Sequence, residues 1–342
     1  MSAGAGSAKG TAEDARTAAK LGLPAGEPPR FDSLDGVRRG LADVGYLADE
    51  SISGVVYLAD RLSKPVLVEG PAGTGKTQLA KSVAELAGAR LIRLQCYEGL
   101  DESKALYEWN YRKQLLRIQA GGPGETESGG TVAGAGAGAG SGSADGAGGR
   151  RGPSWKELEE DIFSEEFLLA RPLLEAIRST EPVVLLIDEV DRVELETEAL
   201  LLEILSEYQV SIPELGTVRA TRLPMVFLTS NNTRELSEAL KRRCLYLHID
   251  YPDLDREREI VRSRVPGITE ELADQVARIV RSLRTLELRK PPSVSETLDW
   301  ARTLVILGID TIDAAGARDT LHILLKYQTD IERAAKELLS AG

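Results

Sequence analysis

Five short segments rich in apolar residues occur along the chain. Runs of this length are typical of strands that are buried on both faces of a parallel sheet. They cover residues 65–69, 90–94, 183–187, 224–229 and 245–249. The sequence therefore predicts five strands, and Val183–Ile187 has the strongest strand character of them.

The stretches between these runs carry a different spacing. Leu79, Val83 and Leu86 recur at intervals of four and three, which predicts a helix directly after the first strand. Further helices are expected over residues 155–167, 195–205 and 234–241. Residues 209–222 predict a small hairpin, because turn residues separate two short extended segments there.

Strand signals stop after Pro252, and only helical spacing follows. The pattern over 272–283 predicts one helix, and the S-x-x-E sequence from Ser293 to Glu296 is a capping box that predicts the start of another. The expected fold class is therefore α/β. A five-stranded parallel sheet flanked by helices is expected over 31–252, followed by a C-terminal helical domain over 253–342.

Two segments have the composition of chain that does not order itself. Residues 1–30 are rich in Ala and Gly, and we expect a disordered tail. Residues 121–152 hold 14 of the 33 glycines and form a low-complexity insert. That insert is either a flexible loop that faces a partner or a tolerated surface insertion, and the second interpretation is favoured because long loops cost little entropy.

Charge and composition narrow the class of protein. The chain has 42 basic and 54 acidic residues, a net charge of −12, which argues against affinity for duplex DNA through phosphate neutralisation but leaves a locally basic channel open. No run of about 18 apolar residues exists, and the N-terminus lacks the apolar core of a secretory signal. With only Cys96 and Cys244, neither a disulfide framework nor a cysteine zinc site is indicated, and a cytoplasmic protein is expected.

The sequence GPAGTGKT after the first predicted strand matches the P-loop pattern. It comprises Gly70, Pro71, Ala72, Gly73, Thr74, Gly75, Lys76 and Thr77. Glycines let backbone N–H groups approach phosphate oxygens, and the following helix presents its positive end to the anion. We expect Lys76 to reach the β- and γ-phosphates of ATP and the Thr77 hydroxyl to bind Mg²⁺.

An acidic pair, Asp188 and Glu189, ends the strand 183–187. Parallel sheets bind ligands at the carboxyl ends of their strands. Asp188 is expected to hold the Mg²⁺ shell, and Glu189 to orient and polarise the attacking water. The alternative is a solvated acidic turn, which the P-loop makes the weaker interpretation.

Other polar and aromatic residues carry weaker signals. Asn231 follows the strand 224–229 and is placed to hold the attacking water or the γ-phosphate. Arg243 belongs to a basic cluster that is either an arginine finger supplied to a neighbouring subunit or a solvated surface group. The two histidines, His248 and His322, have no ligand partners nearby in sequence, and no metal role is expected for them. The segment 107–111 contains Trp and Tyr and forms either a partner-facing loop or part of the core.

Taken in order, the segments GPAGTGKT, LLIDEVDR, FLTSNN and LSEALKRRC resemble those of the AAA+ ATPases. The hairpin over 209–222, before the strand that leads to Asn231, is similar to that of the MoxR branch. The segment LIRLQCYEGLDESKALYEWNYRKQLL resembles more closely the CoxD-like MoxR ATPases that accompany carbon monoxide dehydrogenase and related molybdenum hydroxylases. The resemblance covers residues 31–320 without the insert.

This resemblance implies a homo-oligomeric ring, usually a hexamer, with ATP bound between subunits. It places Asn231 at sensor 1, Arg243 at the arginine finger, and the segment with Gly45 and Tyr46 against adenine. The sensor 2 arginine of the helical lid would fall near Ser293, which is not basic. Arg289 is expected to substitute for it, with Lys290 as the alternative.

The resemblance also implies an ATP-hydrolysing chaperone. Members of this branch assist the assembly or activation of metalloenzymes, often together with a von Willebrand factor A domain protein. A remodeller of a gas-vesicle or Rubisco-activase type stays open, as does the less favoured remodelling of nucleic acid. A scaffold that binds nucleotide without hydrolysis is disfavoured by the acidic pair, because such a protein has no need of a water-orienting carboxylate.

Overall fold

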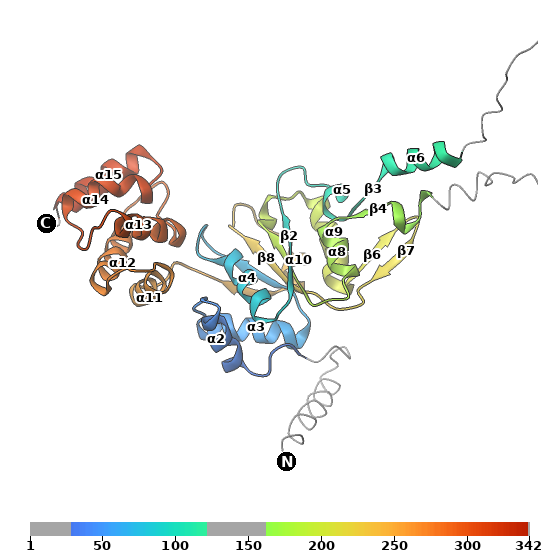
Figure 1. The fold of residues 1–342 in the computed structure, drawn as a ribbon, viewed down its shortest axis with the longest axis horizontal. Helices are drawn as coiled ribbons and strands as arrows, with labels where there is room; N and C mark the ends of the chain where they lie inside the picture. The colour runs from blue at the N-terminus through green and yellow to red at the C-terminus, as the bar shows by residue number, and fades with distance from the viewer. Residues whose placement is uncertain (1–28, 122–161, 341–342) are drawn as a thin grey trace, which may run out of the picture.

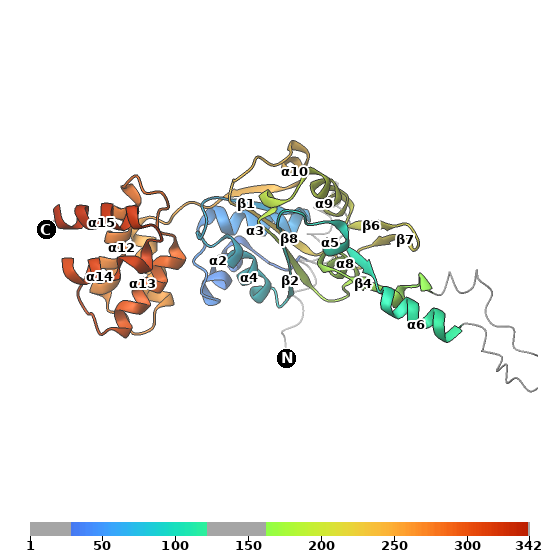
Figure 2. The ribbon, with the colours of Figure 1, turned by 90° about the horizontal axis from the view of Figure 1, so that it is seen from above.

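A computed structural model describes residues 29–121 and 162–340 of the chain (Figures 1 and 2). Its centre is a five-stranded parallel sheet with the order β2-β5-β8-β1-β9. The strands are β1 (Val66–Glu69), β2 (Arg90–Gln95), β5 (Val183–Asp188), β8 (Met225–Ser230) and β9 (Leu245–His248). The P-loop follows β1, which lies between β8 and β9, so the loop emerges inside the sheet and not at its edge.

Helices cover both faces of this sheet, which explains why its central strands are apolar throughout. Along β5, Val184 and Leu186 face one apolar cluster, while Val183, Leu185 and Ile187 face the other. The first cluster is closed by α2 (Leu34–Asp43), α3 (Glu50–Leu62) and α4 (Lys76–Leu86). The second is closed by α8 (Pro172–Arg178), α9 (Leu195–Glu207) and α10 (Glu238–Arg243).

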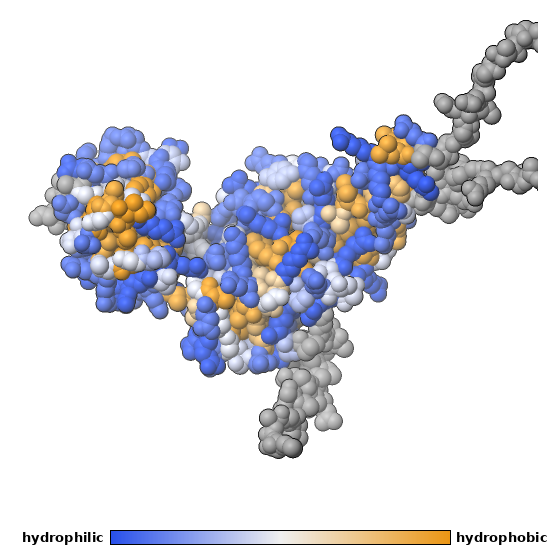
Figure 3. Space-filling view, viewed as in Figure 1, coloured by the Kyte–Doolittle hydropathy of each residue, from blue (hydrophilic) through white to orange (hydrophobic). Residues whose placement is uncertain are grey.

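Two small pairs of antiparallel strands lie outside the five-stranded sheet. Between β2 and the next sheet strand the chain forms α5 (Glu102–Ala105), β3 (Tyr107–Trp109), α6 (Tyr111–Gly121), a 3₁₀ turn at Glu165–Phe167 and β4 (Leu168–Ala170). The second pair is the hairpin β6 (Gln209–Ile212) and β7 (Gly216–Arg219). Helix α6 projects from the body in both ribbon views. Trp109 is buried in the core, whereas Tyr111, Leu115 and Leu116 are exposed, and Figure 3 shows apolar groups gathered at α6.

The C-terminal helices form a separate bundle around the buried Trp300, here called the lid. They are α11 (Leu254–Arg264), α12 (Glu270–Thr285), α13 (Val294–Ile306), α14 (Ala314–Leu324) and α15 (Gln328–Ser340). One buried ion pair joins three of them: Arg284 of α12 donates two hydrogen bonds to Glu257 of α11, of 2.6 and 2.8 Å, and Thr297 of α13 donates a third of 3.1 Å. Burial raises the pKa of Glu257, and Arg284 opposes that shift.

Most of the elements predicted from apolar spacing are confirmed. All five strands occur within one or two residues of their expected bounds, and the helix after β1 and the capping box at Ser293 are present. The hairpin is also present, although its second strand ends at Arg219. The helix expected over 234–241 is wrong at its start, because α10 begins only at Glu238. Arg234 and the backbone N–H of Ser237 instead bind the buried carboxylate of Glu198, which holds 234–237 in a non-helical conformation.

The helix expected over 155–167 falls largely outside the described residues, as do the tail and nearly all of the Gly-rich insert. Its described end departs from the prediction, because the chain turns at Glu165–Phe167 and then pairs as β4 with β3. Across residues 29–121 and 162–340, no helix has the length and apolarity needed to cross a membrane. The same part of the chain contains no cluster of His, Cys, Asp and Glu side chains that could hold a metal, and both histidines are exposed.

We predict that Arg284→Ala destabilises the lid by about 3–5 kcal/mol, because it leaves the Glu257 carboxylate buried without its cation. The side chains of the pair are 9% and 1% exposed. Urea unfolding followed by tryptophan fluorescence measures the change. Arg333→Ala is the matched control, since the ion pair of Arg333 with Glu287 lies on the surface and contributes little. Equal effects of the two substitutions would contradict the prediction.

Candidate nucleotide-binding site

The backbone of the P-loop takes a shape that only glycine allows at two positions. Gly70 has φ +147°, and a Cβ there would lie 2.0 Å from the carbonyl oxygen of Ile249. Gly75 has φ +97° and caps helix α4 in a left-handed conformation. The loop therefore turns tightly between β1 and α4 and directs the first N–H groups of α4 toward the loop, as phosphate binding requires.

The ammonium group of Lys76 folds back onto the loop that precedes it. It donates hydrogen bonds to the carbonyl oxygens of Gly70 and Pro71, at 2.7 and 2.6 Å. Burial lowers the pKa of Lys76, and the carboxylates of Asp191, Asp188 and Glu189 oppose this shift. The cation is thus held by weak backbone acceptors, which a phosphate can replace with a stronger charge-assisted bond.

The carboxylate of Asp188 joins four segments at the carboxyl edge of the sheet. It is 3% exposed. Its Oδ1 accepts hydrogen bonds from the hydroxyls of Thr77, at 3.0 Å, and Thr229. Its Oδ2 accepts from the guanidinium of Arg93 on β2, with the Nε at 3.0 Å. The sequence-predicted metal-binding pair, Thr77 and Asp188, is therefore brought into direct contact.

Glu189 follows Asp188 and has a backbone conformation that is unusual for a residue other than glycine. Its φ and ψ are +59° and +48°, in the left-handed region, where a non-glycine residue is strained. Its carboxylate contacts Arg192 at 2.8 Å, accepts from Gln95 at 3.2 Å and approaches the amide of Asn231 at 3.5 Å. The two residues expected to act on the attacking water, Glu189 and Asn231, thus lie next to each other.

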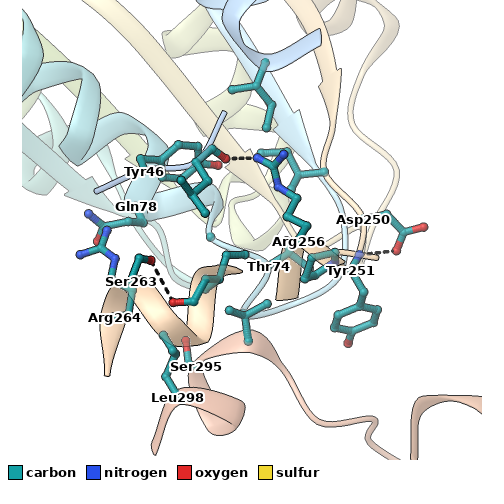
Figure 4. Close-up of a pocket in the computed structure, with 18 of the residues that line it drawn as sticks. Tyr46, Thr74, Gln78, Asp250, Tyr251, Arg256, Ser263, Arg264, Ser295 and Leu298 are labelled. Atoms are coloured by element: carbon teal, nitrogen blue, oxygen red, sulfur yellow. Dashed lines mark hydrogen bonds between the residues drawn. The ribbon is translucent and has the colours of Figure 1, made fainter. Parts of the chain in front are cut away.

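A cavity of about 680 Å³ adjoins the P-loop, between the sheet region and the lid (Figure 4). Its walls come from the second half of the loop, from residues 45–52, from the segment 248–253 and from the lid helices α11 and α13. Gly45 and Tyr46, expected to lie against adenine, both line it. Its volume is in the range of cavities that hold a nucleotide-sized ligand.

The lid touches the P-loop directly at one point. The backbone N–H of Val294, at the start of α13, donates a 3.2 Å hydrogen bond to the carbonyl oxygen of Gly73. A Cβ on Gly73 would lie 2.4 Å from the Cβ of Ser293. The lid therefore approaches the P-loop through backbone and a small side chain at the position where the resemblance implies an arginine.

The structure places Arg289 away from the cavity, which corrects the expectation that it substitutes for that arginine. The guanidinium of Arg289 lies over the ring of Tyr327, at 4.3 Å from the centroid, and the backbone N–H of Arg289 donates to the carboxylate of Asp330. Lys290 donates instead to Glu296, at 2.9 Å. Both basic side chains are held by partners within the lid, and neither lines the cavity.

Arg243 also lies outside the cavity. It ends α10, where its guanidinium donates to Ser206 of α9 and, at 3.0 Å, to the carbonyl oxygen of Ala239. It therefore does not contact the P-loop of its own chain. This position is compatible with a residue that acts on another subunit, and also with a purely structural one.

Three residues at the site had no role in the sequence prediction: Arg93, Gln95 and Thr229. Arg93 donates to both Asp188 and Gln95, and Gln95 donates to Glu189, so the side chains from β2 link the two carboxylates. One signal was available. Arg93 lies on the predicted strand 90–94 and Gln95 directly follows it, and two residues with this spacing lie on the same face of an extended segment at its carboxyl end.

The sequence profile of the AAA family, described as the ATPase family associated with various cellular activities, matches residues 66–251. This match covers more than half of the chain. The chain belongs to the AAA ATPase family. As an AAA ATPase it binds nucleotide and hydrolyses ATP, and the matched segment contains the P-loop, the acidic pair and the strand that precedes Asn231.

Two relatives of this AAA ATPase are 22–24% identical to it in sequence. An uncharacterized protein of Staphylococcus aureus (strain bovine RF122 / ET3-1) is 24% identical over 72% of the chain and 77% of the relative. Another uncharacterized protein, from Staphylococcus haemolyticus (strain JCSC1435), is 22% identical over 76% of the chain and 82% of the relative. Among solved structures, a Thermotoga maritima RuvB P216G mutant matches with a TM-score of 0.44 and 16% identity, over 86% of this chain and 71% of that one. The FIGL-1 AAA domain in complex with ADP matches with a TM-score of 0.35 and 19% identity, over 80% and 72%.

Because burial lowers the pKa of Lys76 from 10.5, its ammonium loses its proton at a lower pH than an ordinary lysine does. Phosphate binding needs the charged form, so nucleotide affinity should fall as pH rises through this lowered pKa, with uptake of a proton on binding. Calorimetric titration with a non-hydrolysable ATP analogue from pH 7 to 10 measures this. Lys76→Arg, which stays charged, should show a flat profile. Wild-type affinity that holds constant to pH 10 would count against the prediction.

Proposed function

We propose that this AAA ATPase is a MoxR-type chaperone that uses ATP hydrolysis to assist assembly or activation of a metalloenzyme related to carbon monoxide dehydrogenase. One observation carries the proposal. The segment whose sequence resembles the CoxD-like group forms β2, α5, β3 and α6, and the MoxR-like hairpin forms β6 and β7. The part of the first segment that follows β2, and the hairpin, both project from the sheet region, outside the nucleotide cavity (Figure 1).

The donor atoms at the edge of the sheet suit Mg²⁺. Thr77 offers a hydroxyl oxygen and Asp188 a buried carboxylate, which are the hard oxygen ligands that this ion prefers. When bound, the ion would neutralise charge on the β- and γ-phosphates. Thr229 and Arg93 fix the orientation of the Asp188 carboxylate, so that its Oδ1 faces Thr77.

Hydrolysis in this proposal depends on Glu189 as the residue that polarises water. In the structure its carboxylate is held by Arg192 and Gln95, with Asn231 beside it. Lys76 is likewise held by the P-loop carbonyls. ATP binding would exchange these contacts for contacts with the γ-phosphate and the attacking water, and the lid would move with the nucleotide because α13 touches Gly73.

We predict that Glu189→Gln keeps ATP binding but lowers turnover by at least about 10²-fold, because the amide cannot accept the proton of the attacking water. Phosphate release measures turnover, and calorimetry measures binding. Glu194→Gln is the matched control, since Glu194 lies in the same segment without a contact to the site. Substantial residual hydrolysis in Glu189→Gln would remove Glu189 from this role.

We further propose that the chain forms a ring, hexameric by resemblance, in which Arg243 reaches the γ-phosphate of a neighbouring subunit. Arg243→Ala should then reduce turnover by about 10³-fold or more. Mixing it with Glu189→Gln subunits, which are inactive but keep Arg243, should restore part of the activity. Absence of restoration in mixed rings, shown to form by size-exclusion chromatography, would contradict a role in trans.

The client is tested by a trapped pull-down. Glu189→Gln protein, held with ATP, is recovered from its own host, and its partners are identified by mass spectrometry. We expect a von Willebrand factor A domain protein together with subunits of a metallohydroxylase, and fewer of both when Lys76→Ala replaces the trapped variant. Nucleic acid, a gas-vesicle protein or Rubisco in their place would overturn the proposed client and leave the ATPase activity intact.

A further inference from the structure

Three arginines of the lid line the nucleotide cavity: Arg256 and Arg264 from α11, and Arg302 from α13. Two of them have partners. Arg256 donates to the carbonyl oxygen of Leu47, and Arg302 pairs with Asp299 at 3.1 Å. Within residues 29–121 and 162–340, Arg264 makes no hydrogen bond or ion pair. Of these three arginines, Arg264 is thus the one whose guanidinium has no hydrogen-bond partner in the described residues.

The guanidinium of Arg264 turns one of its faces toward Gly45. A Cβ built on Gly45 would lie 3.4 Å from its Cζ and 3.6 Å from each terminal nitrogen. Nearly equal distances to three atoms of one plane mean that the guanidinium presents its face, and not its edge, to Gly45. Gly45 has φ +74°, so glycine suits this position on backbone grounds, and the space beside it would admit a Cβ in ordinary contact with the guanidinium.

The cavity beside Arg264 is the part of the site that remains for the base and sugar. Phosphates bound at the P-loop, with Mg²⁺ at Thr77 and Asp188, occupy the edge of the sheet, and neither of these two residues lines the cavity. The cavity has apolar walls at Ile52, Ile249, Ile260 and Leu298. Figure 4 shows Arg264 reaching from the lid toward the side that carries Tyr46 and Gln78.

We propose that Arg264 stacks its planar guanidinium on the purine of the bound nucleotide, with its opposite face toward Gly45, and so provides the lid's side-chain contact with the nucleotide. Arginine favours such stacking because its charge is delocalised over a plane and weakly hydrated. The inference rests on the proposed placement of the phosphates at the P-loop. In this proposal the lid contributes no arginine to the γ-phosphate. It contributes Arg264 to the purine, which ATP and ADP have in common.

The test compares Arg264→Ala and Arg264→Lys with the parent chain. Calorimetry measures ATP binding in the Glu189→Gln background and ADP binding in the wild type. Both substitutions should weaken ATP and ADP by the same factor, about tenfold, because stacking is lost in each case. KM should rise while kcat changes little in the otherwise wild-type chain, since the reacting phosphate is not contacted. Arg262→Ala is the matched control, as Arg262 lies on the same helix and pairs with Glu270 at 3.0 Å.

Each other outcome overturns the inference. Unchanged affinity in Arg264→Ala would exclude the contact, and a loss confined to ATP would place Arg264 at the γ-phosphate. Full affinity in Arg264→Lys would assign a simple charge contact with a phosphate in place of stacking. Failure of the wild-type chain to bind ATP would instead remove the proposed nucleotide site itself, and this is measured before any Arg264 variant.

Discussion

The hydrogen bonds to the carboxylate of Asp188 are the constraint on which the site depends. A buried anion must be compensated, and here the donors come from three other segments: Thr77 of α4, Thr229 of β8 and Arg93 of β2. Thr229 and Arg93 lie toward the carboxyl ends of their strands and Thr77 lies in the first turn of α4, so the donors fix these three places relative to β5. The same contacts that stabilise the charge therefore set the P-loop helix, the acidic pair and the strand before Asn231 in one arrangement.

The three charged side chains around the P-loop and the acidic pair all have partners within the chain. Lys76 is bound to loop carbonyls, Asp188 to Arg93, and Glu189 to Arg192 and Gln95. These contacts offset the repulsion between the two carboxylates and the cost of partly burying the ammonium. Binding is then an exchange of partners, and the energy of the new contacts is reduced by that of the contacts given up.

Apolar spacing was sufficient to predict the sheet, because strands buried on both faces, such as β5 and β8, are continuous apolar runs. The P-loop and the acidic pair were recognisable because their chemistry demands particular residues at fixed spacing. Arg93 and Thr229 were missed for the opposite reason, since they are ordinary residues that matter only through the strand order β2-β5-β8. Arg289 was misplaced because sequence cannot show that Tyr327 and Asp330 hold it within the lid.

The contact between Gly73 and the N-terminus of α13 has a mechanical meaning. The space between Gly73 and Ser293 holds the hydrogen atom of glycine but would not hold a methyl group. Gly73 therefore sets how closely the lid can approach the P-loop. A shift of the loop on nucleotide exchange would be passed through this contact to the 13-residue helix α13, whose far end would move the most. Because Gly73 has no side chain, the backbone of α13 can contact the P-loop directly, and this contact couples the helical bundle to the nucleotide site.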